Sequence, residues 1–365
     1  DVVAVLSEAR FVRVVASADG DALAASGVLA RALDDHDVPF QVRVIVTPDD
    51  RAWQTDGPDE RVVAVGLESE HADAVVDPAE TPTSATAWQI AGEVGSEPDP
   101  TLALAGAVAA GSTPGADGTP ALLEDAILDR RPGVAVPTAD LADGLAHSTL
   151  VHASFSGDES AAGATLAELS LPADLDESAR REVASLVAIA TTEDAPARAA
   201  TAVERFLRPY VTPAGPFETL GGYADVLDVL ATTAPGIGVA LALGHDVRTS
   251  ALDEWREHAR QVHDGLRAAH TGRYDGVFVA RHDDWPTATA ARLLRDYRSP
   301  EPVALAVDNG EATLAGPQGR DLAPVATAAA EAVGGRAGAI GRRARIEFDP
   351  ETDVTDVVTA VREAL

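Results

Sequence analysis

The sequence contains no cysteine and no lysine, and each absence narrows what the protein can be. Without cysteine, disulfides and thiolate metal sites are excluded. Its 28 basic residues are all arginine. The guanidinium of arginine is weakly hydrated and donates two parallel hydrogen bonds to a carboxylate. No apolar run reaches the roughly 18 residues that a membrane span needs, and the first residues lack a signal-peptide layout. We therefore expect a cytoplasmic protein that does not enter a membrane.

Acidic residues dominate the charge. There are 59 of them against 28 arginines, which gives a formal net charge of −31. They are spread over the whole length, and 46% of the residues are hydrophobic, so a disordered acidic tail is excluded. A folded chain coated with carboxylates suits molar salt, where charge repulsion is screened within about 3 Å. We expect a halophilic, archaeal source, and we expect any nucleic-acid contact to come from local arginine clusters.

The first part of the chain alternates between strand and helix patterns. Such alternation with short connections predicts a parallel sheet covered by helices on both faces. The expected strands are residues 11–16, 41–46, 61–65 and 101–108, and the expected helices are 22–33 and 83–91.

The middle and the end of the chain have different patterns. We expect an insert of helices, a tight turn at Gly221-Gly222, a further helix, an apolar strand before His245, a long charged helix and a second α/β unit. The expected helices are 160–168, 177–191, 197–208, 223–233, 249–269, 287–297, 321–333 and 353–364, and the later strands are 276–280, 302–307, 311–315 and 344–348.

These patterns divide the chain into four parts. We expect an α/β N-terminal domain, a helical insert with a return to the sheet, a connector helix and a smaller α/β C-terminal domain. Their ranges are 1–145, 146–248, 249–270 and 271–365.

Two carboxylates follow the first strand, at Asp19 and Asp21. Open α/β sheets place ligands at the C-terminal ends of their strands, and an Asp-x-Asp loop can reach one or two hard cations. The surrounding segment, residues 14–33, resembles the first motif of the DHH phosphoesterases, His-x-Asp-x-Asp-Gly followed by a helix of small residues. Asp19 and Asp21 match its two carboxylates, Ser17 stands where the family has His, and Ala22 stands where it has Gly.

The resemblance continues over the chain and is closest to archaeal RecJ-like proteins. Residues 102–111 resemble a late strand of the family, with Ala110 in place of a metal-binding Asp. Residues 221–244 are similar to a Gly-Gly segment before the interdomain helix. Residues 333–348 resemble a Gly-rich motif of the DHH-associated C-terminal domain, with Ile340 in place of a His.

The family's metal-binding residues are mostly missing. The Asp-His-His triplet is absent, and residues 63–78, where it should lie, offer only Glu70-His71 and Asp73 in its place. A shifted set of ligands would use His71, Asp73 or Asp77. A two-metal phosphoesterase needs several carboxylates and His around two ions. We therefore interpret Asp19 and Asp21 as a vestigial metal site and expect no catalytic residue. Mn²⁺ or Mg²⁺ is the cofactor implied for any activity that remains.

The densest arginine cluster lies in the Gly-rich segment near the C-terminus. Exposed backbone N–H groups and arginines bind phosphates, so we predict a nucleic-acid-binding loop; arginines paired with acids at the surface are the alternative. The predicted residues are Gly335, Arg336, Gly338, Arg342, Arg343 and Arg345.

Three functions remain open. The resemblance favours a catalytically silent RecJ-like subunit that binds GINS or an active RecJ paralogue in replication or repair, and also single-stranded DNA or RNA. An active metal-dependent exonuclease or phosphodiesterase with an altered site is the second. A stand-alone nucleic-acid-binding protein is the third. Walker A, Gly-x-Ser-x-Gly and Rossmann fingerprints are absent in the context they need. We assign the histidines at 147, 152, 245, 258 and 263 no function.

Overall fold

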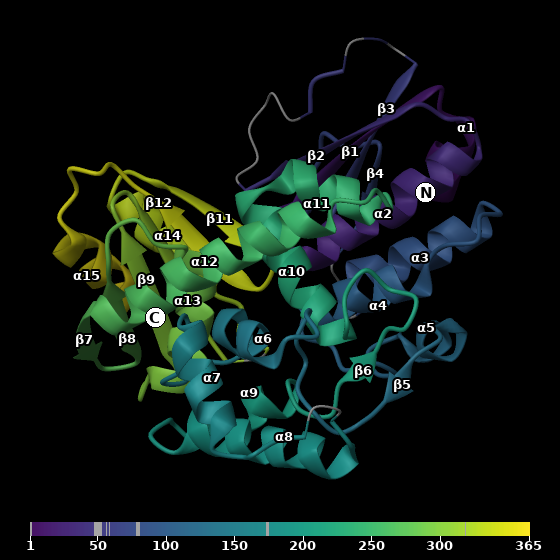
Figure 1. Cartoon of the computed structure of the whole chain (residues 1–365). Helices are drawn as coiled ribbons and strands as arrows, with labels where there is room; N and C mark the ends of the chain where they lie inside the picture. Colours follow the sequence, from purple (N-terminus) through teal and green to yellow (C-terminus); the bar gives the residue numbers. More distant parts are fainter. Residues whose placement is uncertain are drawn as a thin grey trace. The chain divides into compact units, whose positions relative to one another are not determined.

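A computed structural model describes residues 2–46, 53–55, 57, 59–77, 81–172, 175–317 and 319–365. The chain divides into two compact units, each made of two segments (Figure 1). The first unit comprises Asp1–Arg130 and Tyr210–Trp255, and the second comprises Arg131–Pro209 and Arg256–Leu365. The chain therefore passes from one unit to the other three times, and each unit has its own hydrophobic core.

The first unit is built on a parallel sheet in the order β2-β1-β3-β4. Its strands are β1 (Phe11–Ser17), β2 (Phe40–Ile45), β3 (Glu60–Val65) and β4 (Ala74–Val76). Its helices are α1 (Val2–Glu8), α2 (Gly20–Asp35), α3 (Thr83–Glu93), α4 (Pro100–Ala109), α5 (Pro120–Asp125), α10 (Leu220–Thr233) and α11 (Pro235–Ala242), and a short pair of strands, β5 (Asp129–Arg130) and β6 (Tyr210–Val211), completes it.

These helices pack on one face of the sheet. Alternate β1 residues such as Val12 and Val14 join the helices in one hydrophobic cluster. The opposite face holds a small cluster around Val15 and Val62, which Trp53 and Ala72 from loops cover. The expected second layer of helices is therefore not found among the described residues of this unit.

The segment 101–108 is a helix, so the predicted strand there is wrong. Asp99 caps α4, accepting hydrogen bonds from the N–H groups of Thr101 and Leu102, and Pro100 occupies the first turn. Every residue from 102 to 107 is buried, so the segment has no polar face. Periodicity cannot separate such a helix from a buried strand. Ala110 is the C-cap of α4 and does not end a strand.

Two further predictions before the long helix are also wrong. Gly221-Gly222 lies in the first turn of α10, where the Thr219 hydroxyl caps the helix by accepting from the Gly222 N–H at 3.0 Å. The apolar residues before His245 form α11, which begins at Pro235. The cap at Thr219 favours a helix over a turn in the first case, and the first-turn Pro235 favours a helix over a strand in the second.

The second unit contains a six-stranded sheet in the order β11-β12-β10-β9-β8-β7. All neighbours are antiparallel except β8 and β9. The strands are β7 (His270–Tyr274), β8 (Val277–Arg281), β9 (Val303–Asp308), β10 (Glu311–Ala315), β11 (Arg336–Ile340) and β12 (Arg343–Glu347), and the helices of this part are α13 (Thr287–Leu293), which continues as the π-helix η1 (Leu294–Arg298), α14 (Ala323–Ala332) and α15 (Val354–Ala364).

Helices cover both faces of this sheet. One hydrophobic cluster joins it to α14 and α15, and another joins it to α13 and the helices of the insert. The insert consists of α6 (Leu141–His147), α7 (Glu159–Ala167), α8 (Glu177–Thr192) and α9 (Arg198–Glu204). The long helix α12 (Arg248–Ala268) starts in the first unit and continues in the second from Arg256. The mixed α/β architecture predicted from the sequence is thus confirmed.

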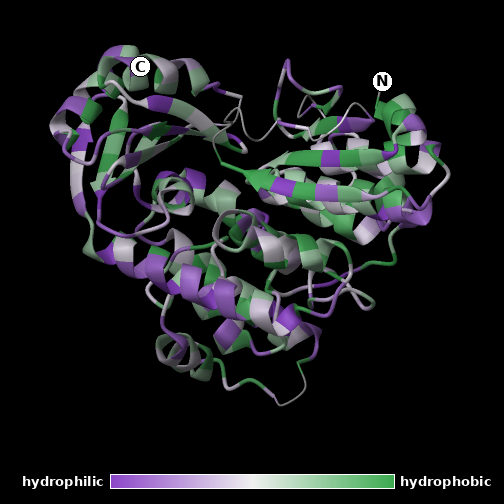
Figure 2. Cartoon of the chain, turned by 90° about the horizontal axis from the view of Figure 1, so that it is seen from above, coloured by the Kyte–Doolittle hydropathy of each residue, from purple (hydrophilic) through white to green (hydrophobic). Residues whose placement is uncertain are grey.

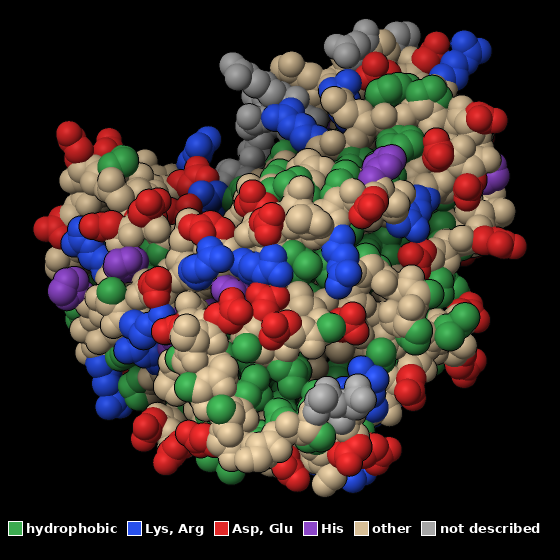
Figure 3. All heavy atoms as spheres, viewed as in Figure 1, with side chains coloured by type: hydrophobic (Ala, Val, Ile, Leu, Met, Phe, Trp, Pro, Cys, Tyr) green, Lys and Arg blue, Asp and Glu red, His purple; other side chains and the backbone are tan. Residues whose placement is uncertain are grey.

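The surface agrees with the acidic composition. Figure 2 shows hydrophobic residues concentrated along the strands of both sheets, and Figure 3 shows acidic side chains spread over the face in view, with arginines among them. No helix among the described residues has the length and apolar character to cross a membrane.

Candidate functional site

Asp19 lies at the end of β1 and caps helix α2. Its extended backbone (φ −139°, ψ 162°) lets its carboxylate accept hydrogen bonds from the N–H groups of Asp21 at 3.1 Å and Ala22 at 2.9 Å. The residue is 8% exposed. Burial, followed by the charge of Asp21, raises the pKa of Asp19 to about 6. The carboxylate that the sequence places in a metal site therefore holds the first turn of a helix.

Asp21 lies in the first turn of α2, and its side chain caps the N-terminus of a second helix, α3. Its two oxygens accept from the N–H groups of Thr83 at 2.8 Å and Ser84 at 2.9 Å. The N-cap residue of α3, Pro82, makes no capping bond with its own side chain, so Asp21 supplies the missing acceptor. Burial raises the pKa of Asp21, and the hydrogen bonds from Ser84 and Thr83 oppose that rise. The Asp-x-Asp pair thus joins α2 to α3.

A third carboxylate, that of Asp228 on α10, lies near the pair. It accepts from the Gly20 N–H at 3.4 Å, and its charge contributes to the raised pKa of Asp19. Gly20 is required there, because a Cβ would lie 2.8 Å from Ala109 Cβ and 2.9 Å from the Asp228 backbone nitrogen. The start of α2 is therefore packed tightly against α4 and α10.

The residues at this site do not fit a two-metal centre. Asp21 uses both oxygens on backbone N–H groups, and no His is among the neighbours that set the pKa of either carboxylate. The described residues contain no group of three or more His, Cys, Asp or Glu side chains able to hold a metal ion. Two ions need more ligands than this pair offers.

The altered ligand set around 71–77 does not gather either. The Asp73 carboxylate accepts from the Val62 N–H at 2.8 Å, which fastens the chain ahead of β4 to β3. His71 is exposed, with its ring centroid 6.4 Å from that of Trp53. Asp77 is exposed just after β4. A metal site formed from these three side chains is not found in the described part of the chain.

The predicted basic loop is a β-hairpin, β11 and β12, at one edge of the C-terminal sheet. Arg345 is 15% exposed in its side chain and forms ion pairs with Glu311 at 2.5 Å and Glu347 at 2.7 Å. Glu347 also forms an ion pair with Arg336 at 3.0 Å, and the side chain of Arg336 is 71% exposed. Gly335 is needed for packing, since a Cβ there would collide with the Glu347 carbonyl.

The turn of the hairpin carries the remaining arginines. Arg342 is exposed in the turn, and Arg343 donates to the Ile340 carbonyl at 3.2 Å. Gly338 pairs with Arg345 across the hairpin. The cluster therefore has a half-buried, acid-paired member in the sheet, Arg345, and exposed members at its edge and tip. Its role in binding nucleic acid stays a prediction.

Four of the five histidines to which we assigned no function lie in the second unit, namely His147, His152, His258 and His263. His147 lies beside an ion pair. The buried Asp143 carboxylate accepts from Arg256 at 2.8 and 3.0 Å and is 3.0 Å from His147 Nδ1. Burial opposes ionisation of Asp143, but the hydrogen bonds from His147 and Arg256 outweigh it and hold its pKa well below the usual range.

His152 and His263 form a stacked pair, with Nδ1 atoms 3.0 Å apart. His263 Nε2 lies 3.1 Å from the Ser148 carbonyl, which can only accept, so His263 Nδ1 accepts and His152 Nδ1 donates. Burial, followed by the charges of Arg298 and Arg267, lowers the pKa of His152 to about 4. Burial also keeps the pKa of His263 well below its usual value. Both rings are thus held neutral.

Known proteins place the chain in a family. Residues 269–363 match the family model described as "Uncharacterized protein rrnAC1427, C-terminal domain". Over 371 aligned residues, the chain is 52% identical to uncharacterized protein rrnAC1427 from Haloarcula marismortui, covering 100% of this chain and 96% of the relative. The chain belongs to the rrnAC1427 family. The source of this relative fits the halophilic, archaeal origin that the acidic composition predicts.

The fold of this rrnAC1427 family member is shared with solved structures of low identity. The manganese-bound exonuclease RecJ matches with a TM-score of 0.51 at 14% identity, over 99% of this chain and 93% of that chain. CDC45 from Entamoeba histolytica matches with a TM-score of 0.59 at 9% identity, over 97% and 95%. The predicted DHH/RecJ-like architecture is therefore confirmed as the fold.

Proposed function

We propose that this protein is a catalytically silent RecJ-like subunit that binds GINS or an active RecJ-like paralogue in replication or repair. The observation that carries the proposal is the engagement of Asp19 and Asp21 as caps of α2 and α3. A phosphoesterase of this fold would need these carboxylates for its ions. Here they stabilise the scaffold, which leaves the surfaces to carry the function.

Nuclease activity tests the silent part of the proposal. Release of nucleotides from labelled single-stranded DNA and RNA is measured in molar KCl with Mn²⁺ or Mg²⁺. The control is Asp19→Asn with Asp21→Asn, which removes both charges and keeps one side-chain oxygen at each position as an acceptor. We expect equal, background release from both proteins. Cleavage that the control lacks would establish an active metal-dependent exonuclease with an altered site instead.

The partner part needs a separate measurement. Purified GINS and a purified active RecJ-like paralogue from the same source are each mixed with the chain and separated by size in molar KCl. We expect a stable complex with one of them, because a protein retained without catalysis acts through its surfaces. Separate elution of the chain from both would refute this part.

Single-stranded nucleic acid is a second candidate ligand, and the hairpin turn supports it. Arg336 is 71% exposed in its side chain, and Arg342 is exposed at the tip, in a chain that is otherwise strongly acidic. If both contact phosphates, Arg336→Gln with Arg342→Gln lowers the slope of log affinity against log salt by roughly 1.4, at about 0.7 per phosphate contact in single strands. An unchanged slope would remove the hairpin from the interface.

A further inference from the structure

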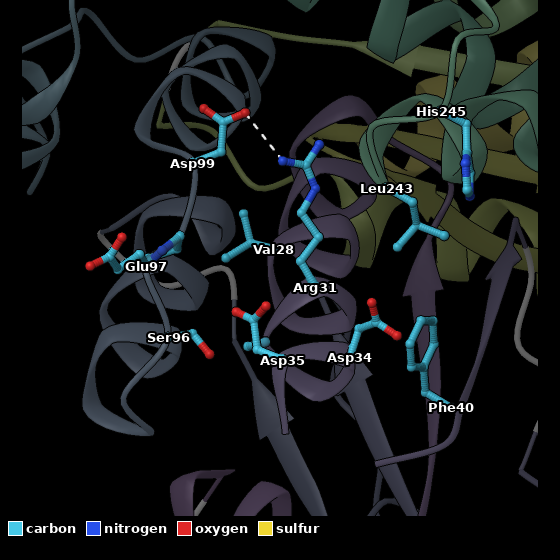
Figure 4. A pocket seen from close by; sticks show the side chains of 12 residues that line it. Val28, Arg31, Asp34, Asp35, Phe40, Ser96, Glu97, Asp99, Leu243 and His245 are labelled. Carbon is cyan, nitrogen blue, oxygen red and sulfur yellow. Dashed lines mark hydrogen bonds and ion pairs between the residues drawn. The ribbon is translucent and has the colours of Figure 1, made fainter. Parts of the chain in front are cut away.

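Two features have no part in the proposed function: a cavity in the first unit (Figure 4) and the open edge of the C-terminal sheet. The arginine of the cavity, Arg31, donates to the Ala242 carbonyl at 2.8 Å and forms an ion pair with Asp99 at 3.4 Å. The other acidic residues of the lining are exposed at the surface. The cavity therefore indicates no particular ligand, whereas the sheet edge has features that indicate a partner.

The open edge is the outer side of β11, the last strand of the six-stranded sheet (Figure 1). A two-residue turn joins β11 to β12, so the residues on either side of it, Ile340 and Arg343, exchange both of their backbone hydrogen bonds. Bonded and outward-facing residues then alternate along an antiparallel strand. The N–H and C=O groups of Ala337 and Ala339 therefore point away from β12, to a side with which none of the described strands pairs.

This edge lacks the protection of the other described edge strands of five or more residues. Natural edge strands usually carry a charged side chain, a proline or a bulge, which hinders pairing with another chain. The edge strands β2 and β7 each carry an arginine within the strand, Arg43 and Arg273. The interior of β11 consists of Ala337, Gly338 and Ala339, and its register with β12 is continuous. An added strand would meet neither charge nor bulk along these three residues.

The outer side of β11 is complementary to that of a second copy. In an antiparallel pair centred on Gly338, Ala337 of each copy faces Ala339 of the other, and the outward N–H and C=O groups of both copies form four hydrogen bonds. Gly338 then faces Gly338 of the second copy on the two-fold axis, as a pair without hydrogen bonds between them. Such pairs approach most closely, and glycine has no side chain to keep them apart.

The ends of this pairing are complementary in charge. The same register places the turn that carries the exposed Arg342 beside residue 334 of the second copy, just after α14 ends. The last carbonyls of a helix carry roughly half a negative charge, and Glu331 in the last turn of α14 is exposed. Arg342 of each copy therefore meets a negative helix end of the other. In molar salt the repulsion between two acidic copies is screened beyond about 3 Å, which leaves such close contacts in place.

We infer that the protein forms a two-fold symmetric dimer in which the β11 strands of two copies pair and make one continuous sheet of their C-terminal sheets. A second copy is favoured over a strand of another protein because the same residues supply both sides of every contact, including Arg342 and the end of α14. The dimer does not depend on the proposed function, since it uses only β11 and the segments next to it.

The first measurement is the mass of the whole chain in molar KCl, by sedimentation or light scattering over a range of concentrations. We expect twice the chain mass of 37.6 kDa at high concentration and dissociation on dilution. The amide hydrogens of residues 337 and 339 should exchange slowly in the dimer and rapidly after dilution, because only the second copy bonds to them. A monomer at every concentration, or a dimer in which these amides exchange rapidly, would overturn the inference.

A matched pair of proline variants locates the contact. Ala339→Pro removes an outward N–H that β12 does not use, and by symmetry the dimer loses two of its four hydrogen bonds. Its dissociation constant should rise roughly tenfold or more. Thr271→Pro makes the same change at an outward-facing position of β7, the other edge of this sheet, and should leave the dimer unchanged. Equal dissociation constants of the two variants would contradict pairing through β11.

A disulfide tests the register without proline. The chain has no cysteine, so a single introduced thiol can pair only with the same thiol of another copy. Gly338→Cys would place two cysteines on the two-fold axis with Cα atoms about 4.5 Å apart, a separation that a disulfide spans. We expect a cross-linked dimer after mild oxidation, whereas the exposed thiol of Thr271→Cys should stay unlinked. Failure of Gly338→Cys to cross-link, or equal cross-linking of both variants, would refute this pairing.

Discussion

Replacing Asp19 by Asn is expected to stabilise the protein at neutral pH, although this is the residue that the family resemblance marks as a metal ligand. Burial and the neighbouring Asp21 raise the pKa of Asp19 from 3.8 to about 6, so keeping this carboxylate ionised costs free energy in the folded state. Asn is an equally good helix cap, and its side-chain oxygen can accept the same two N–H groups.

The pKa shift sets the magnitude. A shift of about two units corresponds to roughly 3 kcal/mol of folding free energy at neutral pH. Asp19→Asn should recover about 1–3 kcal/mol of that cost. Asp19→Ala removes the same charge but leaves the N–H groups of Asp21 and Ala22 without their acceptor, so it should be about 0.5–2 kcal/mol less stable than the Asn variant.

The sign of the pH dependence follows from the raised pKa. The folded state holds a proton on Asp19 more tightly than the unfolded state does, so this group favours folding fully below about pH 4. The wild type then loses this contribution as the pH rises to about 6 and stays level above it, whereas the Asn variant has no such change. The stability gap between the two proteins should therefore open between pH 4 and 6.

Urea unfolding at constant KCl, at several pH values from about 4 to 7, measures this gap. Tryptophan fluorescence or circular dichroism reports the transition, and added Mn²⁺ provides a second condition. The reasoning is wrong if Asp19→Asn is less stable than the wild type at neutral pH, or if the gap does not change with pH. It is also wrong if Mn²⁺ stabilises the wild type and fails to stabilise the variant, because that would show Asp19 holding a metal.

Three further predictions concern packing and burial. Gly106→Ala should lower the free energy of unfolding by about 1–3 kcal/mol, since its Cβ would lie 2.6 and 2.7 Å from side chains of α2 and α3. Gly163→Ala, which has open space around its Cβ, should instead raise the free energy of unfolding by about 1 kcal/mol. Urea unfolding of the two variants tests both values. Arg256→Met should cost about 3 kcal/mol in thermal unfolding, because Asp143 loses both hydrogen bonds from Arg256, and a neutral result would contradict this. Because the pKa of folded His152 is lowered to about 4, the wild type should lose up to roughly 3 kcal/mol of stability as the pH falls from 6.5 to 4. His152→Gln should not show this part of the loss, and an identical fall in stability in both proteins would refute the prediction.

Much of the fold could be predicted from local patterns. The strand at 11–16, the small-residue helix after it and the long charged helix were all predictable, because each has a clear period or a cap in the sequence. The segment 102–107 has no such period, since it is buried on every side, and Asp99-Pro100 before it was the signal for a helix that the prediction passed over. The hairpin strand β11 was missed because its glycines suggested a loop, whereas the pairing with β12 satisfies its backbone.

The candidate site was located from the sequence, but its chemistry was not. Asp19 and Asp21 are where the motif places them, yet the groups that occupy Asp21 belong to Thr83 and Ser84, more than 60 residues away. The partner of Arg345 on β10, Glu311, is likewise 34 residues distant. No local pattern reports such pairings. For Asp21 and Arg345, residues far apart in sequence that the fold brings together decide whether the side chain is available to a ligand.

Helix ends partly neutralise the two carboxylates of the Asp-x-Asp pair. Each helix N-terminus presents roughly half a positive charge, so α2 and α3 together place about one positive charge against the Asp-x-Asp pair. Two divalent ions would supply four. Helix ends therefore supply less positive charge than the two divalent ions of a phosphoesterase centre, which agrees with the proposed loss of hydrolysis. Restoring a His at Ser17 alone would therefore not restore a site, because Asp21 would first have to release α3.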